Sequence, residues 1–224
     1  EQRAALLGRR GGADEVDATE VGLGLDGRPV GQQQAVGLVE HGDHRLPTQE
    51  ICVLAEIGQF ALLVALLTSL VQATLPLVGA SRADRSFMAV ASYGAITSFT
   101  LVLISFGALT LTFIMSDFSV QLVAAHSQIA KPLVYKITGV WANHEGSMML
   151  WVLILTLFAA AIALFGRNLP PPLKARVLAV QGMIASAFLA FVAFTSNPFL
   201  RLADAPLDGS GMNPILQDPG LAIH

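Results

Sequence analysis

Residues 57–81 read IGQFALLVALLTSLVQATLPLVGAS, a run of 25 residues without a charged side chain. An α-helix needs about 20 predominantly apolar residues to cross the hydrocarbon core of a bilayer. Glu56 precedes the run and Arg82 follows it. Its length and composition therefore predict a membrane-spanning helix.

Three further runs of the same kind follow, at residues 86–116, 146–166 and 177–200. Leu, Ala, Val, Phe and Ile dominate each of them. The alternative is a set of core helices in a soluble protein, but four such runs in so short a chain argue against it. We predict an all-α fold, a polytopic transmembrane helix bundle with four spans at about 57–78, 88–115, 147–166 and 177–197.

The charged residues are unevenly distributed. The chain is 54% hydrophobic and 13% charged, whereas soluble domains are about 25% charged. Residues 1–50 hold five Lys or Arg and nine Asp or Glu, and the rest of the chain holds eight and seven. This predicts a polar, poorly structured head, residues 1–53, because it has too few apolar side chains to offset the entropy of ordering. Residues 54–224 form the membrane domain.

The composition argues against nucleic-acid binding, disulfide chemistry and a metal site in the head. Neither part is basic enough for nucleic-acid binding. The single cysteine, Cys52, excludes a disulfide within the chain and a CxxC motif. His41, Asp43 and His44 lie close together in the head, but two histidines without a second pair make an incomplete metal site. The segment is expected to share the disorder or loose structure of the head.

The basic residues between the spans predict the orientation. One short link holds Arg82 and Arg85, and the other, residues 167–176, holds two arginines and a lysine. Short basic links face the cytoplasm. The 117–145 loop and the tail after Leu200 are therefore expected on the outer side of the membrane.

The 117–145 loop carries His126 and His144, and half of its residues are apolar. Such a segment is expected to lie on the membrane surface or to pack on the bundle. Either histidine is a possible ligand, although a surface or hydrogen-bonded role is the favoured interpretation for both. Asn143 or Ser147 is expected to cap the start of the third span.

Six strings together resemble the N-terminal part of the CcmF family, the large membrane subunits of bacterial cytochrome c haem lyase. The resemblance covers about residues 54–224, and the head has no counterpart in it. The strings are AEIGQFALLVALL (55–67), SDFSV (116–120), WANHEGSMMLW (141–151), ARVLAVQG (175–182), TSNPF (195–199) and NPILQDPGLAIH (213–224).

The resemblance implies a multi-pass protein of the bacterial inner membrane. It implies that the protein takes haem b from a periplasmic haem chaperone and helps attach it to the CxxCH motif of apocytochrome c, together with other maturation subunits. The family continues beyond His224 with a Trp-rich segment. The resemblance therefore implies a fragment that is inactive alone, and it leaves the chain's own enzymatic role open.

The resemblance also suggests site residues. The histidine that ends QDPGLAIH in the family is a haem ligand, a role that carries over to His224. Imidazole is an ordinary axial ligand of haem iron. Arg201, near the outer end of the fourth span, is expected either to contact a haem propionate or to anchor the interface. His144 and Glu145 are further candidates, with a structural role as the alternative.

Two other functions remain open. A transporter usually needs ionisable residues inside the membrane, and the four predicted spans contain neither a charged residue nor a histidine. A purely structural membrane subunit is the second alternative. The histidines of the predicted outer segments favour haem handling over a structural role, and only the resemblance makes that choice decisive.

Overall fold

The computed structural model describes residues 48–211, and side chains from residue 53 onward. These residues belong to one compact unit, Leu46–His224. The predicted head up to residue 47, with His41 and His44, and the predicted ligand His224 lie outside the described residues. The helices are α2 (Thr48–Arg82), α3 (Arg85–Met115), α4 (Gln121–His126), α5 (Leu133–Gly139), α6 (His144–Phe165) and α7 (Pro171–Phe194).

The predicted all-α membrane fold is confirmed. Four helices, α2, α3, α6 and α7, are long and apolar enough to cross a membrane. Each contains the core of one predicted span. The fourth predicted span, 177–197, runs past the end of α7 at Phe194, because Asn197 precedes Pro198 and the residue before a proline disfavours the helical conformation.

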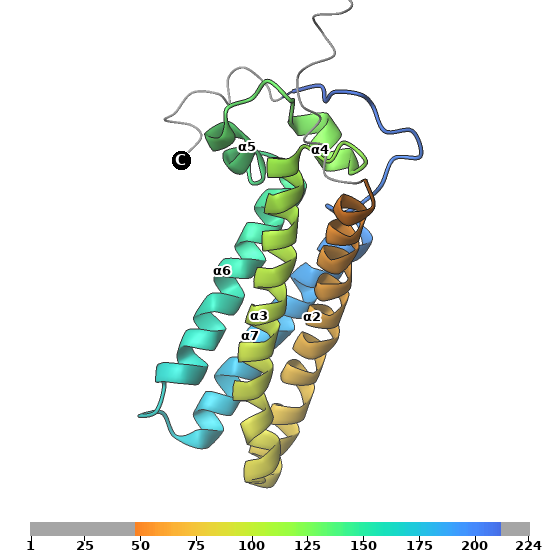
Figure 1. Cartoon of the computed structure of the whole chain (residues 1–224). Helices are drawn as coiled ribbons and strands as arrows, with labels where there is room; N and C mark the ends of the chain where they lie inside the picture. The colour runs from red at the N-terminus through yellow and green to blue at the C-terminus, as the bar shows by residue number, and fades with distance from the viewer. Residues whose placement is uncertain (1–47, 212–224) are drawn as a thin grey trace, which may run out of the picture. The chain divides into compact units, whose positions relative to one another are not determined.

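The long helices form a bundle in which α3 and α7 contact each other and both contact α2 and α6. The helices α2 and α6 lie on opposite sides of this central pair (Figure 1). Both basic links, which join α2 to α3 and α6 to α7, lie at one end. The short helices α4 and α5 and the segment after α7 cover the other end, which we call the outer end.

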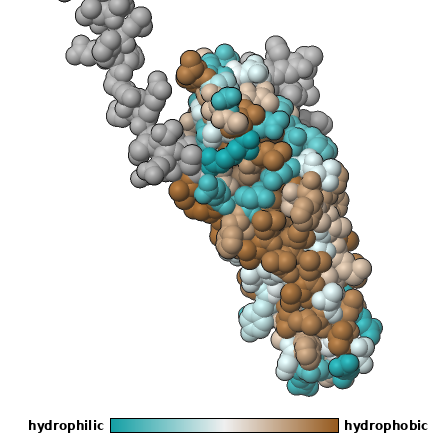
Figure 2. All heavy atoms as spheres, turned by 90° about the vertical axis from the view of Figure 1, so that its right-hand side faces the viewer, coloured by the Kyte–Doolittle hydropathy of each residue, from teal (hydrophilic) through white to brown (hydrophobic). Residues whose placement is uncertain are grey.

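Many large apolar side chains of this bundle point outward. Phe165 is 82% exposed, Phe194 78%, and Trp151 69%. Figure 2 shows the result on one face, an apolar belt around the middle with hydrophilic residues at both ends. An exposed apolar surface of this extent suits a lipid environment, because acyl chains solvate it at no cost.

The interior combines large apolar side chains, among them Leu62, Leu109 and Phe113, with small and polar residues. Gln72 of α2 is 2% exposed, and its Nε2 donates a hydrogen bond to the Leu178 carbonyl of α7 at 2.8 Å. A Cβ on Gly94 of α3 would lie 3.0 Å from Gln72 Cβ, and one on Gly182 of α7 would lie 3.1 Å from Gln72 Cγ. The two glycines thus leave space for the glutamine side chain between three helices. Small residues at helix contacts allow membrane helices to approach closely.

Substituting the glycine next to Gln72 tests this packing. Gly182→Val places a branched side chain against the α2 backbone, where Ala73 N is 3.0 Å from the new Cβ. We expect a loss of about 1–3 kcal/mol, the usual cost of overpacking, measured by reversible unfolding in mixed micelles. Gly107→Val is the control, since no atom lies within 4 Å of a Cβ there. Equal losses in the two variants would contradict the assigned packing.

Candidate functional site

The segment after α7 is tied to the segment after α3. Gln121 N donates to the Leu200 carbonyl at 2.8 Å, and Leu202 N donates to the Ser119 carbonyl at 2.9 Å. These bonds form an isolated antiparallel bridge between Val120 and Arg201. Two loops about eighty residues apart in the chain are thereby held side by side at the outer end.

The turn that follows α3 presents Asp117. Ser116 adopts the left-handed conformation with φ 57°, which ends the helix. Asp117 is 8% exposed, and its Oδ1 accepts hydrogen bonds from Ser119 Oγ at 2.6 Å and from Ser119 N at 3.1 Å. Its Oδ2 is buried and has no hydrogen-bond partner among the described residues. The aspartate thus shapes the loop and keeps one oxygen uncommitted there.

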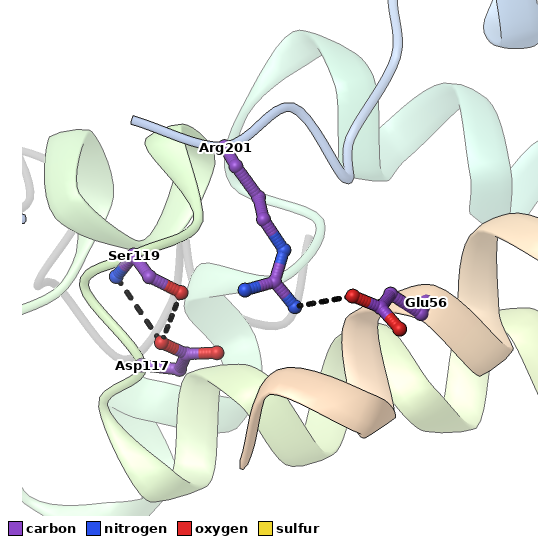
Figure 3. A network of polar contacts seen from close by, with 4 residues as sticks. All are labelled: Glu56, Asp117, Ser119 and Arg201. Carbon is purple, nitrogen blue, oxygen red and sulfur yellow. Dashed lines mark hydrogen bonds and ion pairs between the residues drawn. The ribbon is translucent and has the colours of Figure 1, made fainter. Parts of the chain in front are cut away.

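Arg201 extends from the paired loop toward α2. Its Nη2 lies 3.8 Å from Glu56 Oε1, and the two side chains are 31% and 72% exposed. Figure 3 shows the guanidinium group of Arg201 between Glu56 on one side and the Asp117–Ser119 turn on the other. Because the Glu56 contact is long and exposed, it contributes little to stability. The Glu56 carboxylate therefore holds the guanidinium group only weakly.

A groove of about 410 Å³ adjoins Arg201. Glu56 and Gln59 supply polar side chains to it, while Phe60, Leu63 and Phe199 supply apolar ones. Gln59 Oε1 is buried without a hydrogen-bond partner in the described part of the chain. A groove with a cationic end and apolar walls suits a flat, amphipathic molecule that carries an acidic group.

The floor of this groove depends on a close contact between two of the quoted strings. Phe199, in TSNPF, is buried, and its ring packs directly on Gly58 of α2, where any Cβ would collide with it. Asn197 Oδ1 accepts from Phe199 N at 2.9 Å and holds the turn. Glycine is thus required at position 58 for the loop to reach α2.

The string WANHEG builds the start of α6. Asn143 Oδ1 accepts from Gly146 N at 2.7 Å, so the predicted cap is Asn143. Its Nδ2 donates to the carbonyls of Gly139 at 2.8 Å and Val140 at 3.1 Å, which ties α6 to α5. A Cβ on Gly146 would overlap the Val140 carbonyl oxygen. Asparagine and glycine in this string therefore have structural roles.

The two candidates beside this cap lie apart from the groove lining. His144 is exposed and contacts the Phe191 ring of α7 edge to face, with centroids 6.3 Å apart. Glu145 lies in the first turn of α6. Neither lines the groove beside Arg201. Both residues therefore lie at the outer end but outside the groove.

The other histidine of this region is structurally engaged. His126 Nδ1 lies 3.1 Å from the Leu122 carbonyl within α4, and the His126 carbonyl accepts from Lys131 Nζ at 2.9 Å. Burial lowers the pKa of Lys131, whose ammonium group caps the end of α4. Among the described residues, no group of three or more His, Cys, Asp or Glu side chains can hold a metal ion.

The sequence analysis did not predict that Arg201 lies between Glu56 and the Asp117 turn. These residues are far apart in the chain: Glu56 and Asp117 belong to two of the quoted strings, and Arg201 follows the string TSNPF. Their positions could have suggested that they lie close together, because each is within a few residues of the outer end of a predicted span.

Comparisons with known proteins identify similar proteins of cytochrome c biogenesis. The family model described as cytochrome C assembly protein matches residues 141–224. The chain is 59% identical over 172 residues to the cytochrome c-type biogenesis protein ccl1 of Rhodobacter capsulatus, 77% of this chain and 26% of that protein. It is 40% identical over 173 residues to CcmF of Escherichia coli, 77% of this chain and 27% of that protein.

A solved structure agrees with these relatives. The structure described as cytochrome c heme lyase CcmF is similar to this chain with a TM-score of 0.61 and 30% identity, over 65% of this chain and 24% of that one. The chain spans about a quarter of the length of the curated relatives it matches. The resemblance expected from the six strings is confirmed.

Changing the cap of α6 tests the structural role of its motif. Asn143→Ala removes the acceptor for Gly146 N and the donor to α5, and we expect a loss of about 1–3 kcal/mol in unfolding free energy. Asp is as good a helix cap as Asn, but Asn143→Asp turns a carboxylate oxygen toward two carbonyls. We therefore expect no rescue by Asp in a thermal unfolding assay. Wild-type stability of Asn143→Asp would show that the bonds to α5 are unimportant.

Proposed function

Because this chain is a homologue of the cytochrome c-type biogenesis proteins of the CcmF and CycK type, we propose that it is part of a haem lyase that matures c-type cytochromes. It binds haem at its outer end and helps attach it to the CxxCH motif of apocytochrome c. The observation that carries the proposal is the identity of 40–59% to such proteins over three quarters of the chain.

Haem is both the ligand and the substrate in this proposal. The sulfur of each CxxCH thiol forms a bond to a vinyl carbon, and the thiol proton goes to the other vinyl carbon, so the product is a thioether without another leaving group. The chain's own task is to position the haem and to keep its vinyl edge accessible to the apocytochrome.

Residues of the outer end fit the periphery of a haem b molecule. Arg201 offers the guanidinium group that binds carboxylates such as propionates, and its contact with the exposed Glu56 carboxylate is long. The apolar side of the adjoining groove, with Phe60 and Phe199, suits a porphyrin edge. We assign the axial ligand to His224, outside the described residues, and a supporting outer-end role to His144 and Glu145.

The proposed location is the bacterial inner membrane, with the outer end in the periplasm. The support is that both basic links lie at the opposite end of the bundle (Figure 1), where the cytoplasm is expected. In that orientation the groove faces a periplasmic haem chaperone and apocytochrome c. Other maturation subunits then contact the protein within the membrane or at the outer end.

The axial ligand can be tested by absorption spectroscopy. We expect the intact protein, co-expressed with a periplasmic haem chaperone and purified in detergent, to show a haem Soret band. His224→Ala should weaken or shift this band, because the iron loses an imidazole. His126→Ala is the matched control, since that ring is hydrogen-bonded within α4.

The outcomes separate the parts of the proposal. A Soret band that is identical in His224→Ala and wild type would remove the assigned ligand and leave haem binding in place. A wild-type protein that carries no haem under these conditions would contradict the proposed function itself.

A further inference from the structure

A second groove lies at the end of the bundle opposite the outer end, beside the link between α6 and α7. Its volume is about 420 Å³. The first turns of α3, the link itself and the first turn of α7 line it. Three of the lining residues are cationic, namely Arg85, Arg167 and Lys174.

These cations are available to a ligand. Arg85 and Arg167 are exposed, and within residues 48–211 neither guanidinium group pairs with a carboxylate. Lys174 Nζ donates to the Ala163 carbonyl at 2.8 Å and retains other N–H groups for the groove. The nearby Asp84 does not line the groove, and its Oδ1 accepts from Ser86 N at 2.8 Å.

The same groove has an apolar side. Met88 and Leu169 contribute to its lining. Phe165 and Leu173, next to the link in the sequence, are 82% and 48% exposed. Together they connect the cationic groove with the apolar belt of the bundle. A ligand that fits must carry negative charge at one end and hydrocarbon at the other.

We propose that this groove binds the headgroup of an anionic phospholipid. The phosphate contacts Arg85 and Arg167, with Lys174 beside them, and the acyl chains run along the apolar belt. Basic pockets between membrane helices on the cytoplasmic side have the chemistry that recognises such headgroups. The site is independent of haem and lies at the opposite end of the bundle from the proposed haem groove.

Native mass spectrometry of the purified chain in detergent can measure this binding. We expect cardiolipin and phosphatidylglycerol to bind more tightly than phosphatidylethanolamine. The double variant Arg85→Gln/Arg167→Gln should weaken cardiolipin binding by about 25-fold, about fivefold for each cation removed near a membrane surface. The matched control is Arg82→Gln/Arg176→Gln, because it removes the same charge from exposed positions at the same end that do not line the groove.

Three results would overturn the proposal. Equal weakening in the two double variants would indicate surface charge without a defined site. Equal affinity of the wild-type chain for cardiolipin and phosphatidylethanolamine would remove the selectivity for anions. If glycerol 3-phosphate binds as tightly as the lipid, the apolar side contributes nothing and the ligand is a free phosphate. Unchanged thermal unfolding of both variants in the absence of added lipid checks that the fold is intact.

Discussion

The exclusion of water from the bilayer core is the constraint on which the rest of this structure depends. Backbone groups in hydrocarbon must find partners within the chain, so the charge-free runs form long helices. Many large apolar side chains then face lipid, and small residues such as Gly94 and Gly182 allow close contacts between helices. The buried amide of Gln72 follows the same constraint, because it finds a hydrogen-bond partner within the bundle. It reaches the Leu178 carbonyl through a space that two glycines leave open. Packing in this bundle thus combines close approach at small residues with the burial of apolar side chains such as Leu62 and Phe113.

The same constraint moves charged and ionisable groups to the two ends, and the ends differ. One end has short basic links beside a groove with three cations. The other has two loops held together by backbone hydrogen bonds, a buried aspartate and a guanidinium group between two carboxylates (Figure 3). The helices set the separation between these ends. In our proposals an anionic lipid binds at the first end and haem at the second.

The four long helices were predictable from the sequence because each is a charge-free run of sufficient length, and the Asn143 cap was predictable from its position before such a run. The arrangement of the helices was not, since nearly every face of each helix is apolar and no pattern marks its partner. Arg201 was identified as a candidate, but its proximity to Glu56 depends on the packing of Phe199 against Gly58. That contact joins residues from opposite ends of the membrane domain's sequence. The assigned haem ligand, His224, stays a prediction.

The orientation of the bundle is the claim that connects these features to a periplasmic function. Single cysteines at exposed positions, Asp204→Cys at the outer end and Asn168→Cys in the link between α6 and α7, report it directly in a Cys52→Ser background, since Cys52 is the one native cysteine. Our account predicts that a membrane-impermeant maleimide labels Asp204→Cys in intact spheroplasts and labels Asn168→Cys only after permeabilisation. The reverse pattern would place the outer end in the cytoplasm, away from haem attachment, and would contradict the account.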